Sequence, residues 1–117
     1  MADELDAQKA FLTWEESAAV LQTDASQGIA RAQRLLAMRY LRGRGVPKDE
    51  ATAFYWMQLA AQQHFSLAQR SLGELYENGL GIALNLTLAF DWYCLAALQG
   101  DSIAQKHLQR LAQPNPA

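Results

Sequence analysis

Apolar and small residues recur along this chain at the spacing of a helix. Ala32, Leu36 and Tyr40 are four residues apart, so they form one stripe on a helical surface. The same residue types return 36 residues later, at Ala68, Leu72 and Tyr76. This pattern predicts two equivalent helices, over residues 29–42 and 66–78.

A second apolar pattern follows each of these helices. It places Trp56 among small residues, Ala53 and Ala60, where a neighbouring helix must come close. The pattern also returns 36 residues later, so it predicts a second pair of equivalent helices over residues 49–63 and 85–99.

Glycines and polar caps mark the ends of these helices. Gly43 and Gly45 stand one residue apart after the first helix, and their equivalents are Gly79 and Gly81. Glycine adopts positive φ readily, so each pair is expected to end a helix and turn the chain. Asp49, like Asn85 in the second unit, is a good N-cap for the next helix. Left-handed caps are expected after the second helices, at Gly28, His64 and Gly100.

Two copies of a 36-residue unit make up most of the chain. Residues 29–64 and 65–100 carry identical residues at 14 of 36 aligned positions, far more than chance gives. We expect residues 1–117 to form one domain. Its predicted parts are a capping helix over 7–26 (with Phe11, Trp14, Ala18 and Leu21 at helical spacing), repeat one over 29–64, repeat two over 65–100, a closing segment over 101–112 with its helix at 102–112, and a frayed tail over 113–117. Since a helix pair cannot bury both faces alone, we predict an all-α fold, an α/α solenoid with a capping helix at each end.

The repeated residues resemble a known family. The run A-x3-L-[GA]-x2-Y-x2-G-x-G-[VI]-x2-[DN]-x3-A-x2-W-x3-AA, found at 32–61 and 68–97, is similar to the Sel-1-like repeat, a relative of the tetratricopeptide repeat. Ala37, Asn85 and His64 depart from the usual Gly, Asp and Gly of that pattern. The resemblance implies a solenoid whose first helices line a concave surface. It also implies a protein that holds other proteins, with no catalytic residues to carry over.

The reactive residues do not form a recognised catalytic or metal-binding set. Cys94 is the single cysteine, and His64 and His107 are the two histidines, which is too few for an ordinary zinc site. Cys94 falls within a predicted helix, where an unpaired thiol packs as a small apolar group. No phosphate-binding glycine loop is present, because Gly43 and Gly45 are explained by the turn. We therefore predict a protein without catalytic activity, cofactor or bound metal.

Function is expected where the repeats differ, on the outward face of the first helices. Arg34, Arg70 and Lys106 are 36 residues apart, so stacking would align three cations. Such a ladder suits an acidic peptide or a chain-terminal carboxylate. Alternatively, the three side chains simply lie over apolar neighbours in solvent. The predicted partner-binding residues are Arg34, Leu35, Met38, Arg39, Arg42, Arg70, Glu74, Leu75, Lys106 and Arg110.

Charge narrows the choice of partner. The formal net charge is −2, yet residues 1–24 hold six acids and one base (net −5), and residues 29–64 hold six bases and two acids (net +4). These blocks would attract one another within the fold, or head to tail between copies, weakly and in a salt-sensitive way. Nucleic acid is not expected, because the arginines of residues 31–44 are not interleaved with aromatic residues that would form a stacking surface; the one aromatic residue among them, Tyr40, belongs to the repeated stripe.

The sequence also gives an expectation for the cellular compartment of the protein. It has no run of eighteen apolar residues, so no membrane-spanning segment is expected. Its first residues are acidic where a secretion signal would be basic, which predicts a cytoplasmic protein.

Together these features predict an interaction module or adaptor that presents a concave helical groove to an acidic peptide or partner protein. One alternative is a self-assembling structural protein, which would form a weak homo-oligomer, or a regulatory or inhibitor protein. A less favoured alternative is a hydrolase that uses Cys94.

Overall fold

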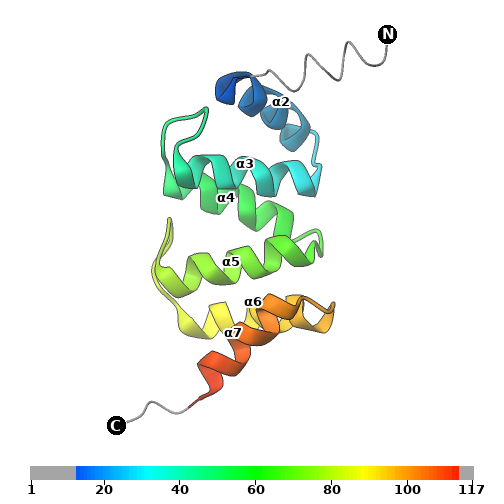
Figure 1. The fold of residues 1–117 in the computed structure, drawn as a ribbon, viewed down its shortest axis with the longest axis vertical. Coiled ribbons are helices and arrows are strands. Elements are labelled where there is room, and N and C mark those ends of the chain that lie inside the picture. Colours follow the sequence, from blue (N-terminus) through cyan, green and yellow to red (C-terminus); the bar gives the residue numbers. More distant parts are fainter. Residues whose placement is uncertain (1–12, 114–117) are drawn as a thin grey trace.

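The computed structural model describes residues 13–113, which form six helices and no strand. In chain order these are α2 (Trp14–Ser26), α3 (Ala30–Arg42), α4 (Glu50–Ala61), α5 (Ser66–Asn78), α6 (Leu86–Leu98) and α7 (Ser102–Ala112). They stack one on the next into an elongated body of 60 × 28 × 25 Å (Figure 1). The predicted all-α solenoid is confirmed. Phe11 and the start of the predicted capping helix lie outside the described residues, as do residues 114–117 of the predicted tail.

The helices begin and end at the residues whose chemistry suits those positions. Asp49 accepts a hydrogen bond from the backbone N–H of Thr52 at the start of α4, with an N–O distance of 3.1 Å. Gly43 ends α3 in the left-handed conformation, with φ of 66°. His64 has the same conformation after α4, with φ of 63°, and it is the non-glycine residue with positive φ in the described part of the chain. The left-handed cap that the sequence predicts at His64 is therefore confirmed.

The second glycine of each pair packs its loop against a helix of the preceding unit, α2 for Gly45 and α4 for Gly81. A Cβ atom on Gly45 would collide with the backbone carbonyl of Trp14, at the start of α2. A Cβ on Gly81 would collide in the same way with the carbonyl of Glu50, at the start of α4. Trp14 and Glu50 are themselves 36 residues apart, so α2 takes the place of a second helix that precedes the first full unit.

Two buried glutamines link successive helix pairs. The side-chain amide of Gln33 donates to the carbonyl of Ala25 at 3.1 Å, and Gln69 donates to the carbonyl of Ala61 at 3.5 Å. Each glutamine also accepts a 2.8 Å hydrogen bond, from Gln63 and Gln99 respectively. Because buried polar groups need partners, this network fixes how one pair sits on the next.

The largest core side chains explain one difference between the repeats. Gly73 faces Tyr93, which is fully buried, and a Cβ on Gly73 would lie 2.6 Å from the tyrosine ring. In the first unit the equivalent residues are Ala37 and Met57, which share one core cluster. A smaller residue on one helix therefore accompanies the larger ring on the other.

The terminal helices expose polar residues at positions that are covered in the inner helices. On α2, Glu16 and Thr23 are exposed where the equivalent residues of α4 are partly covered. On α7, Gln105 and Gln109 are exposed where the equivalent residues of α5, Gln69 and Gly73, are buried. Both ends of the stack therefore carry exposed polar residues, as expected of capping helices, and on α2 these lie beside the half-exposed Val20. None of the helices described is long and apolar enough to cross a membrane.

Candidate functional site

A groove between α3 and α5 gathers six of the ten predicted partner-binding residues. Its volume is about 330 Å³. The predicted residues that line it are Arg34, Met38, Arg42, Arg70, Glu74 and Leu75. The other lining residues are Leu41, Met57, Ser71, Asn78 and Leu80. We call this the α3–α5 groove. Five of its eleven lining residues are apolar, and we call these its floor; three others are arginines.

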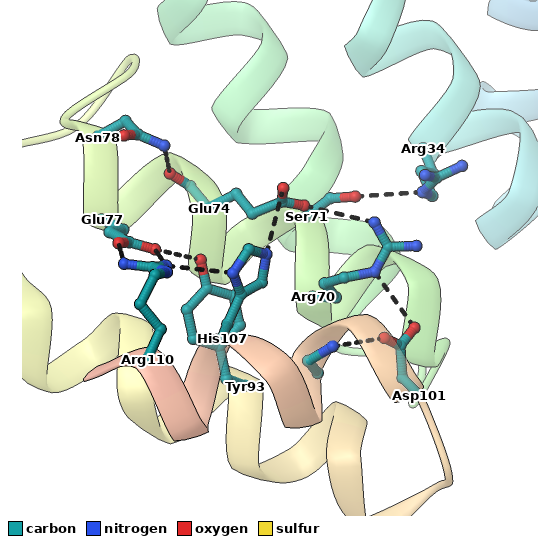
Figure 2. Close-up of polar contacts among 11 residues, drawn as sticks. Arg34, Arg70, Ser71, Glu74, Glu77, Asn78, Tyr93, Asp101, His107 and Arg110 are labelled. Carbon is teal, nitrogen blue, oxygen red and sulfur yellow. Dashed lines mark hydrogen bonds and ion pairs between the residues drawn. The ribbon is translucent and has the colours of Figure 1, made fainter. Parts of the chain in front are cut away.

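Arg70 forms ion pairs with two carboxylates of the same chain. Its Nε lies 3.2 Å from Oδ2 of Asp101, and its Nη1 lies 3.5 Å from Oε1 of Glu74 (Figure 2). Asp101 is also the N-cap of α7 and accepts a hydrogen bond from Ala104 N at 2.8 Å. Arg70 therefore fastens α5 to the start of α7.

Arg34, one repeat earlier, has no such carboxylate. Its Nε donates to the hydroxyl of Ser71 at 3.3 Å, across the groove (Figure 2). None of the ion pairs within residues 13–113 includes Arg34. Burial lowers the pKa of Arg34, and the positive charge of Arg70 lowers it further. The carboxylates of Glu74 and Asp101 raise this pKa in part, although neither forms an ion pair with Arg34.

Arg42 lies at the exposed rim of the same groove, and it too has no ion-pair partner among residues 13–113. The lining residues carry three arginines and one glutamate, a formal charge of +3 − 1 = +2. Since Arg70 is paired with Asp101 and Glu74, the uncompensated charge resides on Arg34 and Arg42.

A second, smaller hollow adjoins the groove on the side of α2. It has a volume of about 200 Å³ and shares Met38 and Arg42 with the groove. The predicted residues Leu35 and Arg39 lie here. Its full lining is Trp14, Leu35, Met38, Arg39, Arg42 and Arg44. We call this the α2–α3 hollow.

The indole of Trp14 lies against two arginine side chains in this hollow. The guanidinium carbon of Arg39 is 4.5 Å from the ring centroid, and that of Arg44 is 5.3 Å from it. Arg39 also donates to the hydroxyl of Ser17 at 2.8 Å and to the Trp14 carbonyl at 3.3 Å. Both arginines thus stack on a half-exposed aromatic ring, an arrangement that stabilises them without neutralising their charge.

The last two predicted residues, Lys106 and Arg110, do not line the α3–α5 groove. Lys106 is exposed on α7. Nη1 of Arg110 forms a 2.7 Å ion pair with Oε2 of Glu77, and the hydroxyl of Tyr93 donates to Glu77 at 2.7 Å (Figure 2). The structure therefore gives the three cations of the proposed ladder three different environments.

Glu77 and its partners form a polar cluster next to Glu74, which lines the groove. The hydrogen bond from Arg110 holds the pKa of Glu77 below its ordinary value, and the same bond raises the pKa of Arg110. Burial, followed by the hydrogen bond to Glu77, raises the pKa of Tyr93. His107 stacks on Tyr93 at 4.7 Å between ring centroids, with its Nε2 3.7 Å from Oε2 of Glu74. This cluster joins α5, α6 and α7, and its contact with the groove lining is the one between His107 and Glu74.

Sequence reasoning missed five of the lining residues. Ser71 and Asn78 lie on the same face of α5 as Arg70 and Glu74, so their helical spacing could have identified them. Met57 comes from α4, and Leu80 follows the end of α5. These two residues enter the groove through packing between elements, which no spacing within one helix indicates.

A third hollow lies at the far end of the stack. It has a volume of about 310 Å³ and is lined by Leu86, Thr87, Phe90, Asp91 and Leu111. Leu86 is half-exposed, whereas its equivalent in the first unit is Glu50. Asp91 is the charged residue among its lining residues, and no arginine or lysine of residues 13–113 lines it.

The described residues offer few groups for chemistry. Cys94 is an unpaired, partly buried thiol on α6. Within residues 13–113, no group of three histidine, cysteine, aspartate or glutamate side chains is placed to hold a metal ion.

Comparison with known proteins identifies relatives. A family model described as Sel1 repeat matches residues 30–65 and 66–101. Among solved structures, a Sel1 repeat protein from Oxalobacter formigenes is 44% identical, with a TM-score of 0.78, and the match covers 81% of this chain and 71% of that protein. No curated protein sequence gives a significant match.

A second solved structure is that of c5321, described as a protective antigen present in uropathogenic Escherichia coli strains displaying an SLR fold. It is 31% identical, with a TM-score of 0.80 over 82% of this chain. The match covers 21% of c5321, so the present chain corresponds to about a fifth of that protein.

Proposed function

Because this chain belongs to the Sel1 repeat family, whose repeats generally serve as scaffolds for protein–protein interaction, we propose that it binds an acidic segment of another protein in the α3–α5 groove. Arg34 carries this proposal. Its guanidinium is partly buried in the groove, it bonds to a neutral hydroxyl, and no carboxylate of residues 13–113 pairs with it.

The groove suits a segment that combines acidic and apolar side chains. A carboxylate between Arg34 and Arg42 would meet two cations that have no counter-ion in the described part of the chain. Apolar side chains beside it would cover Met38 and Leu41, which are partly exposed. The arginines would then select the sign of charge, and the apolar floor would add affinity through burial.

The test compares two matched cations. Arg34→Gln removes the charge in the groove, and Lys106→Gln removes the charge at the equivalent position of the third unit, outside the groove. A partner is first isolated from cell lysate with the wild-type chain, and its affinity for each variant is then measured by calorimetry.

We expect Arg34→Gln to weaken binding about 10- to 100-fold, because a charge-assisted hydrogen bond contributes roughly 1.5–3 kcal/mol. Lys106→Gln should change affinity less than about twofold, as exposed charges contribute little. Equal losses in the two variants would favour the continuous cation ladder over the groove. No loss in either variant would remove the cations from the account.

Arg70→Gln is a third informative variant. Since Arg70 pairs with Asp101 and Glu74, its loss leaves two carboxylates without their partner. We expect this variant to lower the melting temperature, whereas Arg34→Gln should leave it close to the wild-type value. The contrast separates a residue that holds the groove together from one that is available to a ligand.

Polar residues on the end faces of the stack argue against the self-assembly alternative, whereas the half-exposed Val20, on the same face of α2 as Glu16, favours it. Continued end-to-end stacking would bury Glu16 of α2 and Gln109 of α7 without an evident partner. Of the alternatives, a regulatory or inhibitor protein remains compatible with the groove, because it too would act by binding another protein.

A further inference from the structure

We propose that residues 1–12 of this chain bind in the α3–α5 groove of the same molecule and compete there with the external partner. This inference rests on the proposed function, because it takes the groove to be a site for an acidic, partly apolar segment. It adds an occupant from the chain itself, and with it a means of limiting the affinity for other proteins.

The chemistry of residues 1–12 matches that of the groove. Three acids, Asp3, Glu4 and Asp6, lie within the first six residues, against one base, Lys9. Leu5 stands among the acids, so a carboxylate and an apolar side chain are available within two positions. The segment thus carries a side-chain charge of −3 + 1 = −2, the same magnitude as the +2 of the groove lining and the opposite sign.

The α2–α3 hollow lies where this segment joins the described residues. Thr13 directly precedes Trp14, and Trp14 lines the α2–α3 hollow. The hollow adjoins the groove, because Met38 and Arg42 line both. Arg39, Arg42 and Arg44 extend the positive surface along this path.

Chain length does not limit the approach. From Thr13, an extended chain carries Asp6 up to about 24 Å and Asp3 up to about 34 Å, distances comparable with the two shorter dimensions of the molecule, 28 and 25 Å. The three acids can therefore reach Arg42, at the shared boundary of the two hollows, and Arg34 beyond it.

A covalent tether makes even weak binding significant. Tethers of this length give effective concentrations of the order of millimolar. If that concentration is about 5 mM and the segment binds with a Kd of about 1 mM, the groove is free in about one molecule in six. An external acidic ligand then binds about sixfold more weakly than it would to an open groove.

The first experiment neutralises the segment without shortening the chain. The variant D3N/E4Q/D6N is compared with the wild type for binding of a fluorescein-labelled peptide of residues 1–12, measured by fluorescence anisotropy. We expect the variant to bind this peptide about sixfold more tightly, and Arg34→Gln in the variant background to abolish the gain. Equal affinities in wild type and variant would overturn the proposal.

A second experiment shows the contact directly. A nitroxide is attached at Ala2→Cys in a Cys94→Ser background, and the amide signals of the ¹⁵N-labelled chain are recorded. We expect broadening at Ser71 and Asn78, in the groove, and its loss when D3N/E4Q/D6N is added. Broadening confined to residues near the chain start would overturn the proposal. If Cys94→Ser lowers the yield of folded protein, the anisotropy comparison still decides the question.

Mixing separates one molecule from two. When a spin-labelled ¹⁴N chain is mixed with an unlabelled ¹⁵N chain, only contact between molecules broadens the observed signals. We expect no broadening in this mixture, and broadening at Ser71 would overturn the intramolecular assignment in favour of a second copy. If a partner protein binds through Arg34 while the 1–12 peptide does not bind, this inference fails and the proposed function stands; if neither binds, both fail.

Discussion

The packing of Gly81 against α4 gives a stability prediction with its own internal control. Gly81 has φ of 74°, and a Cβ there would collide with the carbonyl of Glu50. Gly100 has φ of 95°, and a Cβ there meets nothing within 4 Å. Gly100→Ala therefore introduces backbone strain alone, while Gly81→Ala introduces strain and a backbone collision between units.

The two contributions can be given magnitudes. Placing alanine in the left-handed region costs about 1–2 kcal/mol. Forcing extra volume into a packed site adds about 1–3 kcal/mol. We therefore expect Gly100→Ala to lower the free energy of unfolding by about 1–2 kcal/mol, and Gly81→Ala by about 2–5 kcal/mol. At about 4 °C per kcal/mol for a chain of this size, the melting temperature falls by about 4–8 °C and about 8–20 °C respectively.

The assay is urea denaturation followed by circular dichroism at 222 nm, with thermal melts of the same samples. Both variants are compared with the wild type at one protein concentration. If Gly81→Ala is no more destabilising than Gly100→Ala, the loop does not pack against Glu50 as the structure places it. The account of the glycine pair as a contact between units would then be wrong.

Three further predictions concern the polar contacts. Gln69→Leu should lower the free energy of unfolding by about 1–3 kcal/mol, since it leaves buried partners unsatisfied, whereas Gln105→Leu, at the exposed equivalent position, should have little effect in the same urea titration. Tyr93→Phe should cost about 1 kcal/mol, through the lost hydrogen bond to Glu77, and an unchanged urea midpoint would contradict this. The pKa of Glu77 is lowered from 4.5 in the folded chain, so its stabilising contribution is complete above pH 4.5 and is lost as the pH falls through the folded pKa. Glu77→Gln should therefore flatten the fall in stability on acidification, and parallel curves for the two proteins would refute this.

Most of the fold could be read from the sequence because helix ends and repeats are local signals. Gly43, Asp49 and His64 act through their own backbone or through residues a few positions away. Their effects do not depend on the rest of the molecule. The packing of one unit on the next could not be predicted from the sequence. It depends on contacts between different helices, such as the hydrogen bond from Gln69 to Ala61 and the close approach of Gly81 to Glu50.

The candidate site, too, was predicted from the sequence only in part. The spacing of Arg34, Arg70 and Lys106 made them equivalent in the sequence, and helical periodicity placed Arg34 and Arg70 on a face that does line a groove. The structure makes them unequal. Arg70 meets Asp101, 31 residues away, Arg34 meets Ser71, 37 residues away, and Lys106 lies outside the groove.

The sequence by itself therefore determined the 36-residue period, the helices and their caps, and the faces on which charged residues lie. These features follow from backbone geometry and from interactions within one or two turns of helix. Only the tertiary structure decided which arginine is neutralised and which is not, and that Met57 and Leu80 complete the groove floor. The reason is physical: an ion pair forms between atoms a few ångströms apart, and stacking brings together residues that chain spacing keeps apart.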